Sequence, residues 1–414
     1  MKLTPGVPLE IGLLLNEGEP SSPIGRLAMA GGLAQLEWSA EVIKIRRRID
    51  PLLYPPEAGL QAARGRDFDG LHGFLADSLP DAWGRRLMKR RLEKLGVRLD
   101  ALRPVDRLAL VGNGGRGALV YKPATTPVED TVAIDLDVLA EQSRILLLGE
   151  DTDLIDALAK LGGASGGARP KVCVGIAADG TVGEGATVEG HDEWIVKFRA
   201  TLDPADIGPV EEAYARMARA AGIDMAPSRL LPAREGFGYF ATRRFDRPSP
   251  GRRLHMVSLA GALEALPDVP SIDYDGLLRA TRAITRHAGD VEQAFRRMVF
   301  NILAHNRDDH TRQHSYLLGA DGEWRLAPAY DLTFSNGPGG EHYLAIEGEG
   351  RTPTRAQVVT LGRRHGLSDR TIADIIDAVR DALADWKVIA TELGVTASRA
   401  EIDDRLAHTA AAFG

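Results

Sequence analysis

The spacing of apolar residues divides the chain into three differently patterned stretches. In the first, short apolar runs are separated by glycine and proline, which predicts short strands. These runs are 11–15, 35–38 and 42–45. A helix is expected at 79–95, where apolar residues recur at helical spacing behind Asp81, the expected N-cap. The other face of this helix carries six arginines and lysines, so it is either a solvated face or a surface for a partner or nucleic acid.

The second stretch mixes helices and strands around a glycine-rich segment. A helix is expected at 135–161, with Asp135 as its N-cap. The glycine-rich segment follows at 162–171, with four glycines in ten residues. Apolar runs then predict strands, with a hairpin turn at Asp179-Gly180. The expected strands are 172–176, 194–198 and 238–242, with a helix at 210–221 before the last one.

The third stretch is mostly helical. Apolar residues recur at helical spacing over 291–304 and again over 371–393. A hairpin at 316–326 interrupts these helices. Ser398 followed by Glu401 predicts a capping box at the start of the final helix.

Composition limits the kinds of protein this chain can be. Its 414 residues carry a net charge of −7, which argues against a globally basic nucleic-acid binder but allows a local basic patch. A single cysteine, Cys173, excludes an internal disulfide framework and is typical of a reducing compartment. No apolar run is long enough to cross a membrane, and the N-terminus lacks the apolar run of a signal peptide. We therefore expect a soluble, cytoplasmic globular protein.

The densest polar cluster lies just after the helix expected at 291–304. It spans 305–310, and Gln313 and Asp331 follow it. Because such groups are costly to bury unpaired, the segment is either an exposed polar turn or a functional site. One functional interpretation is a phosphoryl-transfer site, and the other is a metal-hydrolase site. The ligands of the metal hydrolase would be His305, Asp308, Asp309, His310 and Asp331.

The phosphoryl-transfer interpretation gives each of three residues a task. Asp308 would be the base that accepts the proton of the attacking hydroxyl. Gln313 and Asp331 would hold magnesium, a hard ion that prefers oxygen ligands. The metal-hydrolase interpretation lacks a helical His-Glu-x-x-His pattern and leaves the upstream glycine-rich segment unexplained.

Lys197 alternates with apolar residues on the strand expected at 194–198. A lone lysine on an apolar strand commonly extends its ammonium group to water. Here the strand follows a glycine-rich segment and a hairpin and precedes a helix, which is the order in which a kinase places the lysine that contacts nucleotide phosphates. Glu211 or Glu212, on that helix, could hold Lys197 in an ion pair.

Seven short motifs are spread over nearly the whole chain. They lie at 74–84, 107–119, 166–171, 194–198, 244–247, 306–310 and 328–332. None is specific alone, but together they resemble the HipA-type serine/threonine kinase toxins of bacterial type II toxin–antitoxin modules. The resemblance implies an α+β, protein-kinase-like two-lobed fold with an extra N-terminal β-rich subdomain and a mostly helical C-terminal lobe. The implied regions are an N-terminal subdomain (1–125), an N-lobe-like region with the glycine-rich loop (135–246) and a helical C-terminal lobe with the catalytic loop (247–414).

The resemblance also implies ATP and Mg²⁺ as cofactors and transfer of the γ-phosphoryl group to a protein hydroxyl. By position, Asp308 is similar to the catalytic base, His310 to the catalytic-loop histidine, and Asp331 with Gln313 to the metal ligands. The positions similar to nucleotide-binding residues are Lys197, Gly166, Gly167, Lys171, Glu211, Arg243, Phe245 and Asp246, with 243–245 as the hinge against adenine. The implied partners are a protein substrate and a small helix-turn-helix antitoxin that binds operator DNA.

Two positions depart from the family pattern. The family usually has Asn as the second metal ligand, where this chain has Gln313, whose amide oxygen lies one methylene further out. The inhibitory autophosphorylated serine of the family lies seven residues before the loop lysine, and here that position is Ala164, with Ser165 beside it. The first departure bears on magnesium binding and activity, and the second on self-inactivation.

The sequence thus predicts an ATP- and magnesium-dependent protein serine/threonine kinase, the toxin of a toxin–antitoxin pair, that arrests growth by phosphorylating a host protein. One alternative is a degenerate kinase that acts as a nucleotide-binding co-repressor scaffold with its antitoxin, which Gln313 and Ala164 favour. The metal-dependent hydrolase remains a third hypothesis at this point.

Overall fold

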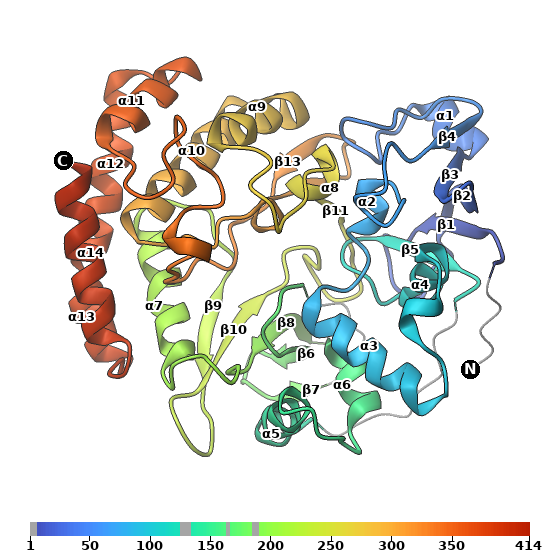
Figure 1. The fold of residues 1–414 in the computed structure, drawn as a ribbon, viewed down its shortest axis with the longest axis horizontal. Coiled ribbons are helices and arrows are strands. Elements are labelled where there is room, and N and C mark those ends of the chain that lie inside the picture. The colour runs from blue at the N-terminus through green and yellow to red at the C-terminus, as the bar shows by residue number, and fades with distance from the viewer. Residues whose placement is uncertain (1–5, 125–133, 163–165, 184–189) are drawn as a thin grey trace.

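Antiparallel sheets and separate helices build the chain (Figure 1). The computed structural model describes residues 6–124, 134–162, 166–183 and 190–414. Ala164 and Ser165, which bear on the predicted self-inactivation, lie outside these described residues. The mixture of sheets and helices confirms the predicted α+β class. Below we call 6–124 the N-terminal subdomain, 134–246 the sheet lobe and 247–414 the helical lobe.

Among the described residues of the N-terminal subdomain, five strands form an antiparallel sheet in the order β4-β3-β2-β1-β5. In β1 the side chains of Leu9, Ile11 and Leu13 are buried, because alternate residues of a strand share one face. The strands are β1 (Leu9–Leu13), β2 (Ser22–Ala30), β3 (Leu33–Trp38), β4 (Leu60–Ala62) and β5 (Leu119–Lys122). The helices are α1 (Ala40–Ile45), α2 (Gly73–Ala76), α3 (Ala82–Lys94) and α4 (Pro104–Val111).

The strand predicted at 42–45 is wrong, because these residues lie in helix α1. Ser39 starts the helix directly after β3: its Oγ accepts a hydrogen bond from the Val42 N–H at 3.3 Å. An apolar run this short fits a strand and a helical turn equally well, so its periodicity could not separate them.

The sheet lobe contains a second antiparallel sheet, whose described strands are ordered β7-β6-β8-β10-β9. Val196 of the central strand β8 packs in the buried cluster with Val172 and Val174 of β6. The side chain of Lys197 therefore lies on the opposite face. The strands are β6 (Lys171–Ala177), β7 (Val182–Gly183), β8 (His191–Lys197), β9 (Ser228–Leu231) and β10 (Tyr239–Arg243). The helices are α5 (Leu136–Leu147), α6 (Ile155–Gly162) and α7 (Ile207–Ala220).

The predicted N-cap at Asp135 is confirmed. Its carboxylate accepts hydrogen bonds from the N–H groups of Asp137 at 3.0 Å and Val138 at 3.2 Å. The single helix predicted over 135–161 is instead two helices, α5 and α6, which are separated by residues 148–154. Gly149, in the left-handed region at φ 88°, allows the chain to leave the first helix.

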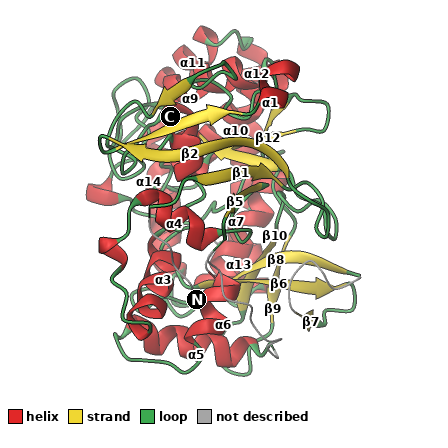
Figure 2. Cartoon of the chain, turned by 90° about the vertical axis from the view of Figure 1, so that its right-hand side faces the viewer, coloured by secondary structure: helices red, strands yellow, loops and turns green. Residues whose placement is uncertain are grey.

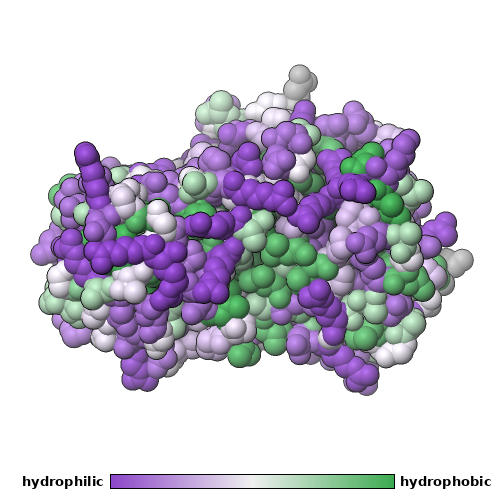
Figure 3. Space-filling model, turned by 90° about the horizontal axis from the view of Figure 1, so that it is seen from above, coloured by the Kyte–Doolittle hydropathy of each residue, from purple (hydrophilic) through white to green (hydrophobic). Residues whose placement is uncertain are grey.

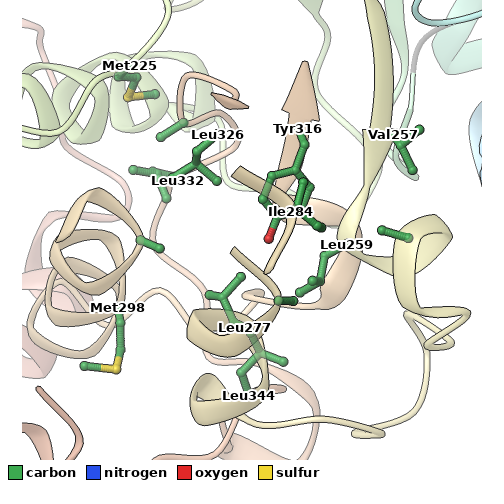
Figure 4. Packing of buried hydrophobic residues seen from close by; sticks show 14 of the residues in the cluster. Met225, Val257, Leu259, Leu277, Ile284, Met298, Tyr316, Leu326, Leu332 and Leu344 are labelled. Atoms are coloured by element: carbon green, nitrogen blue, oxygen red, sulfur yellow. The ribbon is translucent and has the colours of Figure 1, made fainter. Parts of the chain in front are cut away.

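The helices of the helical lobe pack their apolar sides together and form a buried core. Figure 4 shows Leu277, Ile284, Met298 and Tyr316 in this core, where each side chain is buried. The predicted hairpin at 316–326 is confirmed as β12 and β13, which join β11 in a small sheet. The strands are β11 (His255–Ser258), β12 (Ser315–Leu318) and β13 (Trp324–Leu326). The helices are α8 (Leu259–Leu263), α9 (Tyr274–Thr285), α10 (Ala288–Leu303), α11 (Arg355–Arg364), α12 (Asp369–Ala384), α13 (Trp386–Glu392) and α14 (Arg399–Phe413).

Two details predicted near the C-terminus are wrong. The helix expected over 371–393 is divided at Asp385 into α12 and α13. The capping box at Ser398 does not form: Ser398 Oγ donates to Asp206 Oδ1 at 2.7 Å, and Glu401 accepts from Asn336 Nδ2 at 2.9 Å. Both polar side chains therefore connect distant segments, because tertiary partners compete with local caps.

The basic face of α3 is partly solvated and partly an internal contact: Arg85 and Lys89 are exposed, whereas three other basic side chains bond to the sheet lobe. Helix α3 packs against α6, and Figure 2 shows the two side by side with α5 below them. Arg90 donates to the carbonyl of Gly149 at 2.8 Å, Arg86 to that of Leu147 at 3.4 Å, and Lys94 to that of Thr152 at 3.1 Å. Cations favour the carbonyl end of a helix such as α5. These contacts fix the N-terminal subdomain against the sheet lobe.

The outer surface is mainly polar. The face in Figure 3 is mostly hydrophilic, with an apolar patch near its middle. Large exposed apolar side chains such as Leu60 and Leu202 are scattered along the chain. Within the ranges that the structure describes, none of the helices has the length and apolarity that a membrane crossing needs.

Candidate active site

A cleft lies where the sheet lobe, the helical lobe and the N-terminal subdomain meet. The sheet lobe contributes the end of the glycine-rich segment and β8, and the helical lobe contributes residues around 310–313 and Asp331. The N-terminal subdomain contributes Asp81 and Arg116. Ten of the predicted site residues line this cleft: Gly166, Gly167, Lys171, Lys197, Arg243, Phe245, Asp246, His310, Gln313 and Asp331.

Lys197 is the centre of a buried ion-pair cluster. It ends β8, and its Nζ lies 3.1 Å from Glu211 Oε2 of α7 and forms an ion pair with Asp331 Oδ1. Burial alone would lower the pKa of Lys197, but the charges of Asp331 and Glu211 raise it above its usual value. Lys197 is therefore held as a fixed cation by carboxylates from two other elements.

The two glutamates proposed for this role have different environments. Glu211 also accepts from Arg169 Nη1 at 3.0 Å and so links two cations of the cleft. Glu212 accepts from Arg216 at 2.9 Å and from Ser228 Oγ at 2.7 Å, away from Lys197. Of the two, Glu211 is the partner of Lys197.

Lys171 places a second ammonium group beside Lys197. The two residues are directly opposite each other on β6 and β8. Lys171 is buried and donates a hydrogen bond to the carbonyl of Gly166. Burial lowers the pKa of Lys171 to about 8. One lysine is thus charge-compensated, while the other loses its charge at a mildly alkaline pH.

Asp331 faces the lysines from the helical lobe. Its backbone is in the left-handed region, at φ 58°, which a non-glycine residue adopts uncommonly and mostly at functional sites or turns. Its Oδ2 accepts a hydrogen bond from Gln313 Nε2 at 2.9 Å. Burial alone would raise the pKa of Asp331, but Lys197 and Lys171 lower it far below its usual value. Asp331 is therefore a permanent carboxylate at any ordinary pH.

Asp308 does not line the cleft itself but lies beside His310, which does. It lies in the loop after α10, and its side chain is 45% exposed, with Oδ1 3.9 Å from His310 Nε2. Partial burial raises the pKa of Asp308, His310 lowers it and Asp331 raises it, with a net increase. The carboxylate is accessible to a ligand and more basic than an ordinary aspartate.

The neighbouring Asp309 is held inside the protein by hydrogen bonds. It is completely buried and accepts hydrogen bonds from Tyr274 Oη at 2.7 Å, His342 Nδ1 at 2.8 Å and the Tyr343 N–H at 2.8 Å. These bonds anchor the loop to α9 and to the segment around 342. Asp309 is therefore fixed inward, whereas the side chain of Asp308 is 45% exposed.

The ligand set of the metal-hydrolase hypothesis is dispersed. His305 contacts Thr409 Oγ1 at 3.1 Å and Asn336 Oδ1 at 3.2 Å, and its ring stacks on Phe334 with centroids 5.5 Å apart. The carboxylate of Asp309 accepts hydrogen bonds from Tyr274 and His342, as described above. Over the described part of the chain, no group of three or more His, Cys, Asp or Glu side chains could hold a metal ion. The five residues of that hypothesis do not form one ligand set.

The predicted hinge lies at the end of β10. Arg243 donates to Asp192 Oδ1 at 2.8 Å, and the Phe245 ring packs against Tyr330 with centroids 5.4 Å apart. Asp246 is buried; it accepts from the Gly117 N–H at 2.9 Å and forms ion pairs with Arg244 and Arg247. Its carboxylate thus joins the hinge to the N-terminal subdomain.

Asp81 is the main site residue that sequence reasoning missed. It precedes α3 but makes no side-chain cap; its Oδ2 accepts from the Gly167 N–H at 2.7 Å, and Oδ1 forms an ion pair with Arg312. Arg116 lies 3.7 Å away, and the Trp83 N–H donates to the Gly167 carbonyl at 3.3 Å. Burial would raise the pKa of Asp81, but Arg116 and Arg312 lower it. The only available signal was that Asp81 lies inside the motif at 74–84.

Comparison with known proteins places these features in a family context. Residues 163–386 match the family model of the HipA-like C-terminal domain, and residues 20–122 match that of the HipA N-terminal domain. The chain is similar to a chain of the Shewanella oneidensis MR-1 toxin–antitoxin complex of HipA, HipB and operator DNA. The TM-score is 0.65 at 18% identity, and the match covers 98% of this chain and 95% of that one. A sequence search against curated proteins gives no match.

A second solved structure is much less similar. The proinflammatory kinase CtkA of Helicobacter pylori matches with a TM-score of 0.32 and 12% identity over 49% of this chain and 90% of that one, which is too low to support an argument. At 18% identity, the likeness to the Shewanella chain shows the fold alone. It confirms the predicted two-lobed fold with an extra N-terminal subdomain, whereas the predicted region boundaries stay predictions.

Proposed function

This chain belongs to the HipA family, and from that premise we propose that it is an ATP- and magnesium-dependent protein serine/threonine kinase, the toxin of a toxin–antitoxin pair. The observation that carries the proposal is the ion-pair cluster of Lys197, Glu211 and Asp331. These residues come from β8, α7 and the segment after β13, and a kinase requires all three together at the phosphates of its nucleotide.

The glycine-rich segment supports a phosphate-binding role. A Cβ atom on Gly167 would lie 2.5 Å from Lys171 Nζ, and one on Gly166 would lie 2.5 Å from Arg116 Nη1. Both atoms are the ends of flexible side chains, so the stronger requirement for glycine is the backbone of Gly167, which has φ 95°. The Lys171 ammonium and the Arg116 guanidinium beside this backbone are donors that phosphate oxygens can use.

The ligand chemistry also fits Mg²⁺, which is bound by one or two carboxylates together with substrate phosphates. Asp331 would supply a carboxylate oxygen and Gln313 an amide oxygen. The Gln313 amide now donates its N–H to Asp331, so its oxygen would face a cation after rotation about its last side-chain torsion. When bound, the metal ion would neutralise charge that develops on the transferred phosphoryl group.

Asp308 is suited to be the base. Its exposed carboxylate can accept the proton of a serine or threonine hydroxyl as the oxygen forms its bond to phosphorus. His310, 3.9 Å away, can orient it, and Asp309 anchors the loop from below. Lys197 and Lys171 would contact the phosphates of a bound nucleotide from neighbouring positions on β8 and β6.

The partner proposal rests on the family and on one relative. The similar Shewanella chain was solved with HipB and operator DNA. We therefore propose that this chain acts in the cytoplasm with a small helix-turn-helix antitoxin and contacts operator DNA through it. A host protein hydroxyl would be the phosphoryl acceptor.

Growth arrest on induced expression tests the function. We expect arrest with the wild-type chain and normal growth with Asp308→Asn, because removing a positioned base costs about 10²–10⁴-fold in rate. Asp179→Asn, in the exposed turn after β6, is the matched control and should still arrest growth. An Asp308→Asn variant that stays as toxic as wild type, while both variants have the wild-type melting temperature, would show that the assigned role is wrong.

A second candidate function is the co-repressor scaffold without phosphotransfer. It is favoured by Gln313, which presents its nitrogen to Asp331 where a metal-binding oxygen is expected. Calorimetry with a non-hydrolysable ATP analogue and Mg²⁺, combined with transfer of label from ATP, separates the two. Binding heat with label on protein supports the kinase, and binding heat without any label on protein supports the scaffold.

A further inference from the structure

A second cavity lies next to the nucleotide cleft, and the proposed function does not use it. Its volume is ≈ 500 Å³, and it lies between the N-terminal subdomain and the helical lobe. It shares four lining residues with the cleft: Asp81, Gly167, His310 and Arg312. The two cavities are therefore adjacent. We call this second cavity the acceptor groove.

The floor of the acceptor groove is apolar. Leu79, Ala82 and Met88 line it from the N-terminal subdomain, and Leu266 and Pro267 line it from the loop after α8. Ala82 is exposed at the first position of α3, so its methyl group is open to a ligand. Two separate parts of the chain thus form opposite sides of one groove, which suits an extended peptide segment.

The charges at the rim are not balanced. Asp69 pairs with Arg107 at 2.9 Å, Asp81 pairs with Arg312, and Arg85 lies 3.6 Å from Asp100 outside the groove. Two further carboxylates, Asp67 and Asp268, are exposed, one on each side. Neither has a hydrogen-bond or ion-pair partner within the described residues. The charged lining side chains are four carboxylates and three guanidinium groups, which leaves one net negative charge: Asp67, Asp69, Asp81 and Asp268 against Arg85, Arg107 and Arg312. The two carboxylates without a partner, Asp67 and Asp268, favour a cationic ligand.

One lining residue of the groove, His310, neighbours the candidate base Asp308, which itself lines neither cavity. His310 lines the groove, lies 3.9 Å from Asp308 and packs its ring against Tyr343 with centroids 5.5 Å apart. Burial raises the pKa of the Tyr343 hydroxyl, and the charges of Asp308 and Asp268 raise it further. The Tyr343 hydroxyl is thus close enough to Asp268, at the rim, and to Asp308, the candidate base, for both charges to raise its pKa.

We propose that the acceptor groove binds an extended segment of the substrate protein, with basic residues flanking the serine or threonine that receives the phosphoryl group. Apolar residues of the segment would pack on Leu79 and Leu266, and its cations would pair with Asp67 and Asp268. This assignment rests on the proposed kinase function. In the transfer, the hydroxyl oxygen bonds to the γ-phosphorus, the bond from that phosphorus to ADP breaks, and the hydroxyl proton passes to Asp308.

Peptide binding tests the groove without requiring catalysis. The probes are two fluorescent serine peptides of equal length, one with lysines and one with glutamates beside the serine, measured by anisotropy in the presence of a non-hydrolysable ATP analogue and Mg²⁺. We expect the wild-type chain to bind the lysine peptide about tenfold more tightly, since two exposed ion pairs are involved. The charge-reversed double variant Asp67→Lys/Asp268→Lys should invert this preference.

Two matched controls make the test specific. Asp377→Lys/Asp381→Lys changes the net charge equally on the exposed face of α12 and should keep the wild-type preference. Ala82→Trp, which fills the groove from an exposed position, should abolish binding of the lysine peptide, while Ala384→Trp at the end of α12 should not. Calorimetry with the ATP analogue should give wild-type affinity for all four variants.

The outcomes separate the groove from the function. Equal binding of both peptides by the wild-type chain, or an unchanged preference after reversal at Asp67 and Asp268, would overturn the groove assignment even if the chain phosphorylates other proteins. Binding that follows the predicted pattern, with no phosphate transfer from ATP to the lysine peptide or any cellular protein, would retain the groove and reject the kinase. The assignment is also overturned if Ala82→Trp and Ala384→Trp bind the lysine peptide equally.

Discussion

The two ends of the candidate active site differ in how much they are fixed before any ligand binds. At one end, Lys197 is held by Glu211 and Asp331, and these three side chains are mostly buried. At the other end, the side chain of Asp308 is 45% exposed, and its Oδ1 lies 3.9 Å from His310 Nε2. The first end is preorganised, whereas the second is accessible to solvent.

This difference corresponds to two tasks in phosphoryl transfer. Binding and neutralising phosphates gains most from fixed charges that need no reorganisation. Accepting a proton requires a carboxylate that a hydroxyl can reach and whose pKa is not too low. The oppositely shifted pKa values of Asp331 and Asp308, one lowered and one raised, match this division of labour.

The largest effect is expected at the fixed end. Asp331→Asn removes the only carboxylate assigned to the metal and one of the two anions beside Lys197, so phosphate transfer should fall by about 10³-fold or more. Transfer from labelled ATP at saturating Mg²⁺ measures this loss, with Asp179→Asn as the remote control. If Asp331→Asn retains a tenth of the wild-type rate or more, the fixed end does not have the assigned role.

The role of Asp308, at the open end, should be visible in the pH dependence of kcat/KM. Because the base works only when deprotonated, kcat/KM should rise about tenfold per pH unit up to the pKa of Asp308 and level off above it. The raised pKa of Asp308 places this break above the value of an ordinary aspartate. Asp308→Asn should have a flat residual rate over the same range. A wild-type profile without an acid limb above the ordinary aspartate range would contradict the account.

Asp81 tests whether the N-terminal subdomain helps to position the fixed end. Asp81→Ala removes the acceptor of the Gly167 N–H and the anion beside Arg312, so the KM for ATP should rise about tenfold with a smaller change in kcat. Asp81→Asn keeps a hydrogen-bond acceptor and should have a weaker effect. Asp100→Ala, an exposed carboxylate of the same subdomain, is the control. A lowered melting temperature with an unchanged KM would show that Asp81 stabilises the fold but does not position the nucleotide site.

The smallest effect is expected at Lys171. Its pKa of about 8 means that its ammonium group is charged below pH 8 and neutral above it. The affinity for ATP should therefore fall about fivefold between pH 7 and pH 9 as one phosphate-binding cation is lost. Lys171→Arg keeps its charge over this range and should flatten the dependence. Identical profiles for the two proteins would show that Lys171 does not contact the phosphates.

The sequence predicted features that depend on local pattern. The strand that ends at Lys197, the helix with Glu211 and the hairpin before Asp331 follow from periodicity and turn residues, which act within a few positions. Their order along the chain matches that of a kinase, and this match predicted that they converge. Short runs such as 42–45 lack the length that periodicity needs, and there the prediction was wrong.

Side chains whose partners are far away in sequence could not be predicted in the same way. Asp81 has the residue type and position of an N-cap, yet its carboxylate binds Gly167 because α3 packs against α6. Ser398 likewise bonds to Asp206 instead of its own helix. The arginines of α3 indicated a solvated face or a partner surface, but three of the basic side chains bond to carbonyls of the sheet lobe. In each case tertiary packing decided which local preference was satisfied.

The central claim is that Asp308 accepts a proton while the γ-phosphoryl group passes to a protein hydroxyl. The most direct measurement incubates wild-type and Asp308→Asn protein, each with γ-labelled ATP, Mg²⁺ and an extract of cellular proteins, and follows label on serine and threonine. We predict label on protein with the wild-type chain and about 10²-fold less with Asp308→Asn, although both bind the ATP analogue equally. Equal labelling by the two proteins, or none by the wild type, would contradict the account.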